Sequence, residues 1–143
     1  EPLDLYNLLC EVVAAFYKDF TDSGFSVDVQ LNENLPAVNA DRKAMTRIFT
    51  NLLQNALKHG ETSIFIRLFQ KDGRVAAVFA NNAPSMTEED LLHVFDRFFT
   101  ADKMRTGQDT GLGLTIAKQF VERMGYQISA YLENSVFRIE ILF

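Results

Sequence analysis

A glycine-rich stretch, Gly-Gln-Asp-Thr-Gly-Leu-Gly-Leu, occupies residues 107–114 and leads directly into an amphipathic run that begins at Thr115. A loop that opens a helix in this way exposes unpaired backbone N–H groups beside the positive end of the helix dipole. Such a place attracts phosphate, so the stretch indicates a nucleotide site. An ordinary tight turn explains the three glycines about equally well. The spacing matches neither the dinucleotide-binding Gly-x-Gly-x-x-Gly pattern nor the Walker pattern, which disfavours both of those folds.

Residues 41–59 are predicted to form a helix with two asparagines and a lysine along one side. Apolar residues recur at helical spacing throughout the segment, and Gly60 is a typical C-terminal stop. At about 100° of rotation per residue, Asn51, Asn55 and Lys58 fall on one stripe at the rim of the apolar face. Each asparagine costs roughly a few tenths of a kcal/mol of helix stability, so the pair indicates a polar function. The alternative is a pair of solvent-exposed amides beside a lysine.

Together the two elements resemble the ATP-binding domain of the sensor histidine kinases, in the superfamily that also contains gyrase B, the heat-shock 90 chaperones and the MutL repair proteins. The segment 51–59 is similar to the family's N box, 94–99 to its F box and 107–114 to its second glycine box. The likeness extends over essentially the whole chain, including residues 2–5 and the segment 35–41 that leads into the predicted helix.

The resemblance implies a site for ATP and Mg²⁺. Asn55 corresponds to the metal ligand, Lys58 to the residue that meets the phosphates, and His59 to the position whose ring lies against the adenine. One protein oxygen is enough to fix the ion, because Mg²⁺ keeps several of its waters. The catalytic positions implied in this way are Asn51, Asn55 and Lys58.

The resemblance also implies a wider set of nucleotide-binding positions, which includes a flexible lid over the triphosphate. Phe95 and Phe99 are expected mainly to anchor this lid, while Lys103 and Arg105 add positive charge to it. The complete set is Asn51, Asn55, Lys58, His59, Asn81, Ala83, Met86, Phe95, Phe99, Lys103, Arg105, Gly107, Thr110, Gly111, Leu112, Gly113 and Leu114.

Asn51 stands where ATP-hydrolysing members of the superfamily carry a glutamate that acts as general base toward water. A carboxamide has no useful basicity near neutral pH, so this site lacks a group that activates water. Phosphoryl transfer depends chiefly on positioning and charge neutralisation, and such a site still delivers the γ-phosphate to an imidazole held in line. The sequence therefore favours a kinase over a hydrolase. It also disfavours the anti-sigma serine kinases, which retain the acidic residue.

The first glycine box departs from the family pattern Asp-x-Gly-x-Gly. Asn81 stands at the aspartate, Ala83 at the first glycine and Ser85 at the second. An amide oxygen accepts the adenine amino group less strongly than a carboxylate, by about 1 kcal/mol. We therefore expect ATP to bind with a dissociation constant on the order of tens to hundreds of micromolar. The alternative is a degenerate module that contacts a partner without doing chemistry.

The 143 residues are 48% hydrophobic, which suits a single domain (1–143) with its own core. Periodicity predicts helices at about 4–22 and 41–59, a short one after Thr87 and one that ends near Met124. Strands are expected at 25–31, 62–69, 74–80, 127–132 and 135–142. This order predicts an α+β fold, a two-layer sandwich in which a mixed sheet of about five strands carries three main helices on one face.

The chain is also expected to depend on partners. Neither His59 nor His93 has the neighbours of the family's phosphoacceptor histidine, so the resemblance implies an acceptor on a separate dimerisation domain of the same kinase. The second partner that the resemblance implies is the receiver domain of a response regulator. The net charge of −5 argues against nucleic acid, and no apolar run is long enough to span a bilayer. We expect a cytoplasmic domain without direct membrane contact, cut from a longer sensor anchored in the bacterial membrane.

Overall fold

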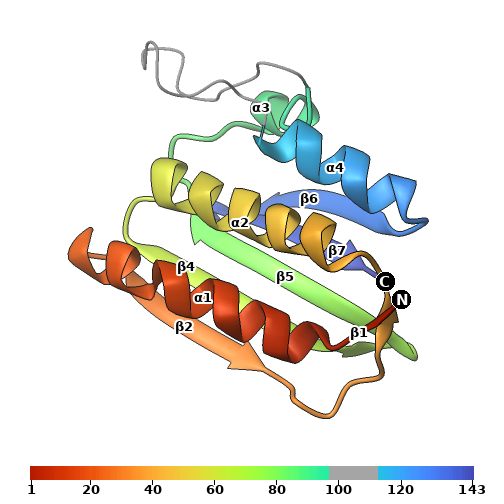
Figure 1. Ribbon diagram of the computed structural model, residues 1–143. Helices are drawn as coiled ribbons and strands as arrows, with labels where there is room; N and C mark the ends of the chain where they lie inside the picture. Colours follow the sequence, from red (N-terminus) through yellow and green to blue (C-terminus); the bar gives the residue numbers. More distant parts are fainter. Residues whose placement is uncertain (97–112) are drawn as a thin grey trace.

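The computed structural model describes residues 1–96 and 113–143 (Figure 1). The elements follow one another as β1 Pro2–Leu3, α1 Leu5–Asp22, β2 Ser26–Leu31, β3 Val38–Asn39, α2 Arg42–His59, β4 Ser63–Lys71, β5 Arg74–Asn82, α3 Glu88–Leu92, α4 Gly113–Arg123, β6 Gln127–Glu133 and β7 Val136–Leu142. Each helix and strand predicted from the sequence is present, with bounds that differ by no more than two residues. The antiparallel pair of β1 and β3 was not predicted.

The main sheet has five strands in the order β2-β4-β5-β7-β6. β2 runs parallel to β4, and the remaining neighbours are antiparallel, so the sheet is mixed. The helices α1, α2 and α4 lie side by side over one face of this sheet (Figure 1). The α+β two-layer sandwich expected from the sequence is therefore confirmed.

The ends of these elements follow local rules of the backbone. Asp4 and Asp41 cap α1 and α2, and each side chain accepts a hydrogen bond from a backbone N–H of the first turn. Thr87 and Asp90 form a reciprocal capping box at α3, which explains the acidic residues there by capping. Tight turns with positive φ at both central residues close the two hairpins, β4–β5 and β6–β7.

The core lies between the sheet and the three main helices, with α2 at its centre. The rings of Phe49 on α2 and Phe79 on β5 lie 5.7 Å apart, so the middle of α2 packs directly on the central strand. Fully buried side chains line the inner face of α2 over its whole length: Met45, Ile48, Phe49, Leu52, Leu53 and Ala56. This packing fixes the rotation of α2 and hence the direction in which its polar stripe points.

The opposite face of the sheet carries none of the described helices (Figure 1). On this face Phe65, Arg67 and Phe69 of β4 stand in register with small residues of β5. The Arg67 guanidinium lies 4.7 Å from the Phe69 ring centroid and 5.9 Å from that of Phe65, and Arg138 lies 5.3 Å over Tyr131. Such stacking shields apolar surface while the charge stays in water. Among the described helices, none combines the length and the apolar character needed to cross a membrane.

Candidate functional site

The polar stripe of α2 is partly withdrawn from solvent. Asn51 and Asn55 are half-buried, as is His59 at the last helical position, and Lys58 is exposed. The Asn51 Nδ2 atom is buried and has no hydrogen-bond partner within the part of the chain that the structure describes. An unsatisfied buried donor costs about 1–3 kcal/mol, so this amide is a candidate ligand contact.

The carboxyl end of β5 supplies the second set of predicted residues. Asn81 is 6% exposed, and it is the one buried polar residue among residues 1–96 and 113–143. Its Nδ2 donates to the Asn82 carbonyl oxygen at 3.2 Å, which fixes the orientation of the amide. The backbone N–H of Ala83 donates to the Ser135 carbonyl oxygen, and the Met86 N–H donates to the Ala83 carbonyl oxygen. Backbone hydrogen bonds therefore fix the conformation of the loop that follows β5.

The two sets of residues meet at Gly60, immediately after α2. A β-carbon at this position would lie 2.7 Å from the Ala56 carbonyl oxygen and 3.1 Å from both Asn81 Cβ and Phe25 Cε2. Only glycine allows so close an approach. The structure thus brings the carboxyl end of α2 close to the β-carbon of the buried Asn81, the first position of the first glycine box.

Two side chains of α4 contact Phe95 of the F box. The Thr115 hydroxyl donates to the Phe95 carbonyl oxygen at 2.9 Å, and the Lys118 ammonium lies 5.0 Å over the Phe95 ring. Phe95 packs against the core from its edge, and Leu114 is buried in it. These contacts tie Phe95 to α4 and to the core, and its role as an anchor of the lid stays a prediction.

The remaining predicted positions belong to the lid. α4 begins at Gly113, so the glycine-rich stretch leads directly into a helix, as its sequence indicated. The predictions for Phe99, Lys103, Arg105, Gly107, Thr110, Gly111 and Leu112 lie outside the described residues.

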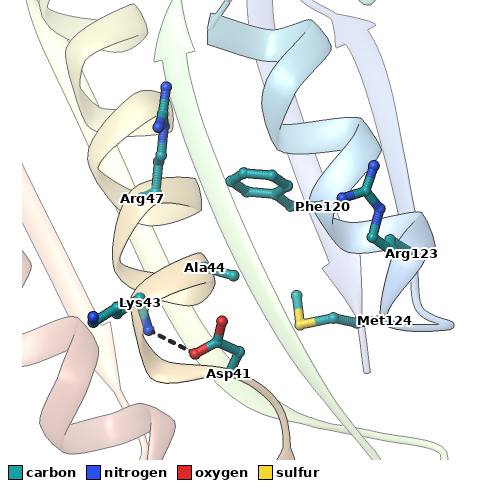
Figure 2. A pocket seen from close by; sticks show the side chains of 7 residues that line it. All are labelled: Asp41, Lys43, Ala44, Arg47, Phe120, Arg123 and Met124. Carbon is teal, nitrogen blue, oxygen red and sulfur yellow. Dashed lines mark hydrogen bonds between the residues drawn. The ribbon is translucent and has the colours of Figure 1, made fainter.

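An open groove lies between α2 and α4, near the amino end of α2 and away from Gly60 (Figure 2). It has a volume of about 430 Å³ and is lined by Asp41, Lys43, Ala44, Arg47, Phe120, Arg123 and Met124. The Arg47 guanidinium lies 6.0 Å from the Phe120 ring centroid. The residues predicted to bind nucleotide do not line this groove, and sequence reasoning did not identify it. Basic residues four apart at 43 and 47 were the available signal.

The donor set near Asn55 suits a Mg²⁺ ion that arrives with a polyphosphate. Among the described residues, no group of three or more His, Cys, Asp or Glu side chains gathers that would hold a metal. A carboxamide oxygen is a hard ligand of the type Mg²⁺ prefers, and phosphates and water complete its coordination. The orphaned Asn51 amide adds a donor of the kind that a phosphate oxygen accepts.

Residues 40–142 match the family described as "Histidine kinase-, DNA gyrase B-, and HSP90-like ATPase". This match covers well over half of the chain. The chain belongs to this family. The resemblance inferred from the three boxes is therefore confirmed, and so is membership of a family of ATP-using proteins.

Individual relatives narrow the comparison to sensor kinases. The signal transduction histidine-protein kinase BaeS of Escherichia coli is 32% identical over 90% of this chain and 28% of its own length. The sensor protein VanS of Enterococcus faecium is 29% identical over 97% of this chain and 37% of its own length. The chain thus spans only about a third of these curated relatives. Among solved structures, a nucleotide-free catalytic domain of histidine kinase ThkA superposes with a TM-score of 0.81 at 29% identity, covering 99% of this chain and 96% of that one.

Proposed function

We propose that the chain is the ATP-binding catalytic domain of a two-component sensor kinase, which transfers the γ-phosphate of Mg-ATP to a histidine on a separate dimerisation domain. The observation that carries the proposal is the contact at Gly60. There the N-box helix meets the buried Asn81, so one ligand is able to reach both. The relatives named above are sensor kinases, which supports transfer to histidine.

Each polar group near Gly60 has a proposed task. The Asn55 Oδ1 atom holds the Mg²⁺ ion, which neutralises phosphate charge when it is bound. Lys58 meets the phosphates from one turn further along α2. His59 lies against the adenine ring, and the Asn81 oxygen accepts a hydrogen bond from the adenine amino group. The lid that follows the F box covers the triphosphate.

Asn51 supports a transferase rather than a hydrolase. Its amide has no useful basicity, so Asn51 does not remove a proton from water as a glutamate at this position would. We propose that the same amide, whose Nδ2 is buried without a partner among the described residues, donates to a phosphate oxygen as negative charge shifts during transfer. The acceptor histidine brings its own nucleophilic nitrogen and needs no base in this domain.

The proposed partners are the dimerisation and phosphoacceptor domain of the same kinase and, after it, a response regulator receiver domain. The parent protein is proposed to be a longer bacterial sensor anchored in the membrane, with this domain on the cytoplasmic side. Neither a nucleic acid nor the membrane itself is proposed to touch the domain, whose net charge is −5.

A labelling experiment tests the proposed function. The chain is incubated with ATP labelled at the γ-phosphate, alone and with the helical phosphoacceptor domain of its parent kinase. We expect label on the added domain, none on the chain alone, and none when the acceptor histidine is replaced by glutamine. Strong self-labelling, or steady release of phosphate without a partner, would contradict the proposal.

A second function is favoured by the altered first glycine box. Ala83 is buried and Ser85 is exposed where the family pattern has glycines, which fits a degenerate module that only contacts a partner. Calorimetry with ATP and Mg²⁺ distinguishes the two functions. A kinase domain binds with a dissociation constant on the order of tens to hundreds of micromolar, and a degenerate module shows no magnesium-dependent binding.

A further inference from the structure

One side chain holds the turn that follows α2. Asn82, at the end of β5, accepts hydrogen bonds at its Oδ1 atom from the backbone N–H groups of Glu61, Thr62 and Ser63, at 3.3, 2.9 and 3.1 Å. Its Nδ2 atom donates to the Thr62 hydroxyl at 2.8 Å. Both ends of this amide are therefore engaged with the turn, although the turn and the strand end are about twenty positions apart in the sequence.

The same turn adjoins both halves of the proposed nucleotide site. It begins directly after Gly60, where the chain touches Asn81. The backbone carbonyl of Asn82 accepts the hydrogen bond that orients the Asn81 amide. The Thr62 carbonyl also accepts from the backbone N–H of Ser26, so the turn is joined to β2 as well.

The Asn82 side chain contributes more to position than to overall stability. Glu61 and Thr62 are exposed and Ser63 is half-buried, so water reaches two of the three N–H groups when the amide is removed. The expected loss is then chiefly that of exposed hydrogen bonds, with one part-buried donor. What disappears is the fixed separation between the end of α2 and the end of β5.

We propose that Asn82 is a positioning residue for nucleotide binding, which sets the gap between the adenine contact at Asn81 and the phosphate contacts at Asn55 and Lys58. This inference rests on the proposed function. ATP spans both contacts, and its affinity depends on their separation because binding at one contact raises the effective concentration at the other. Adenosine and tripolyphosphate each use one contact and are indifferent to the gap.

The test compares Asn82→Ala with the wild-type chain by NMR titration with Mg-ATP, adenosine and Mg-tripolyphosphate. We expect the ATP affinity to fall about tenfold, while the affinities for the two fragments change less than about twofold. The variant Asn82→Asp keeps the acceptor oxygens and should bind ATP within about twofold of wild type. Thermal unfolding followed by circular dichroism verifies that each variant is folded at the temperature of the titration.

Asn32→Ala is the matched control. The Asn32 Oδ1 atom also accepts from a backbone N–H, that of Asn34 at 2.9 Å, in an exposed loop after β2. We expect this variant to bind all three ligands like wild type.

Two results would overturn the inference. One is an Asn82→Ala variant that binds ATP as well as wild type does, and the other is an equal loss for ATP and both fragments, which indicates general damage to the fold. Should Asn82→Ala fail to fold, a tenfold loss of ATP affinity in Asn82→Asp would overturn it as well. A different result marks failure of the proposed function: the wild-type chain itself would show no ATP binding. The inference about Asn82 would then fall with it.

Discussion

The two ends of α2 present opposite kinds of polar surface. At the amino end, Lys43 and Arg47 are exposed, and together with Arg123 of α4 they line an open groove (Figure 2). At the carboxyl end, half-buried Asn55 stands one turn before the contact with Asn81, and Lys58 adds a positive charge beside these amides. The richer positive charge is therefore at the end where no nucleotide is proposed to bind.

Under the proposed function, local positive charge is a poor guide to where phosphate binds on this chain. Exposed cations are well solvated and cost nothing when they are left alone. A buried amide without a partner has lost its water, and it regains a hydrogen bond only from a ligand. The orphaned Nδ2 of Asn51 and the close backbone approach at Gly60 belong to the carboxyl end. Four substitutions test whether the two ends differ in this way.

The largest difference is expected from Asn55→Ala at the carboxyl end. It removes the proposed metal ligand, and we expect magnesium-dependent ATP binding to weaken by on the order of tenfold or more. Calorimetry with ATP, in the presence and absence of Mg²⁺, measures the effect. The control is Arg47→Ala, one of the exposed cations at the amino end. Equal ATP affinities of Asn55→Ala and Arg47→Ala would show that the two ends of α2 do not differ in nucleotide binding.

The next effect is that of Gly60→Ala on folding. The new β-carbon would lie 2.7 Å from the Ala56 carbonyl oxygen. Because backbone atoms cannot move away as easily as a flexible side chain, we expect a loss of about 1–3 kcal/mol in the free energy of unfolding. Urea denaturation measures this loss. ATP affinity should also fall, because α2 is pushed away from Asn81.

Gly24→Ala is the control for this substitution. Gly24 has a φ of +82° and nothing within 4 Å of a built β-carbon, so alanine there costs about 1–2 kcal/mol through backbone strain alone. Its ATP affinity should stay that of wild type. Weakened ATP binding in both variants would mean that general destabilisation, not the contact at Gly60, is responsible.

A smaller effect is expected from Asn81→Asp, which restores the residue of the family pattern. A carboxylate accepts the adenine amino group more strongly, by about 1 kcal/mol, or roughly fivefold in affinity. Stability should fall at the same time, since the residue is 6% exposed and its new oxygens meet the Asn82 carbonyl that now accepts from Nδ2. Calorimetry and thermal unfolding report the two changes. An affinity for ATP that does not rise would argue against adenine at this position.

The smallest effect is expected from Arg123→Ala at the amino end. Arg123 is exposed on the last turn of α4, and surface substitutions of this kind change stability by no more than about 0.5 kcal/mol. ATP affinity should stay within about twofold of wild type, as measured by calorimetry. A loss as large as that of Asn55→Ala would show that the open groove, and not the amide stripe, receives the phosphates.

The sequence predicted the helices and long strands because each has a local signal. The caps Asp41 and Thr87, the helical spacing along α2 and the alternation in the strands all act within a few neighbouring residues. The pair of β1 and β3 was missed because each strand has two residues, too few to show a period. For the proposed nucleotide site, pattern alone predicted the glycine-rich stretch and the polar stripe of α2, and the roles of individual residues were implied by the family resemblance.

The hydrogen bonds of Asn82 and the open groove were not predictable from local pattern. The Asn82 oxygen meets three N–H groups only because β5 folds back beside the turn after α2. The groove exists only because α4 packs against α2, which brings Arg123 near Arg47. Both features depend on tertiary contacts between segments far apart in the sequence.

The most direct test of the account is an NMR titration of the chain with Mg²⁺ and a nonhydrolysable ATP analogue, followed at side-chain amide and guanidinium signals. The account predicts that the amides of Asn51, Asn55 and Asn81 shift together with one dissociation constant, while the guanidinium signals of Arg47 and Arg123 stay still. Shifts confined to the two arginines, with the three amides unmoved, would contradict it.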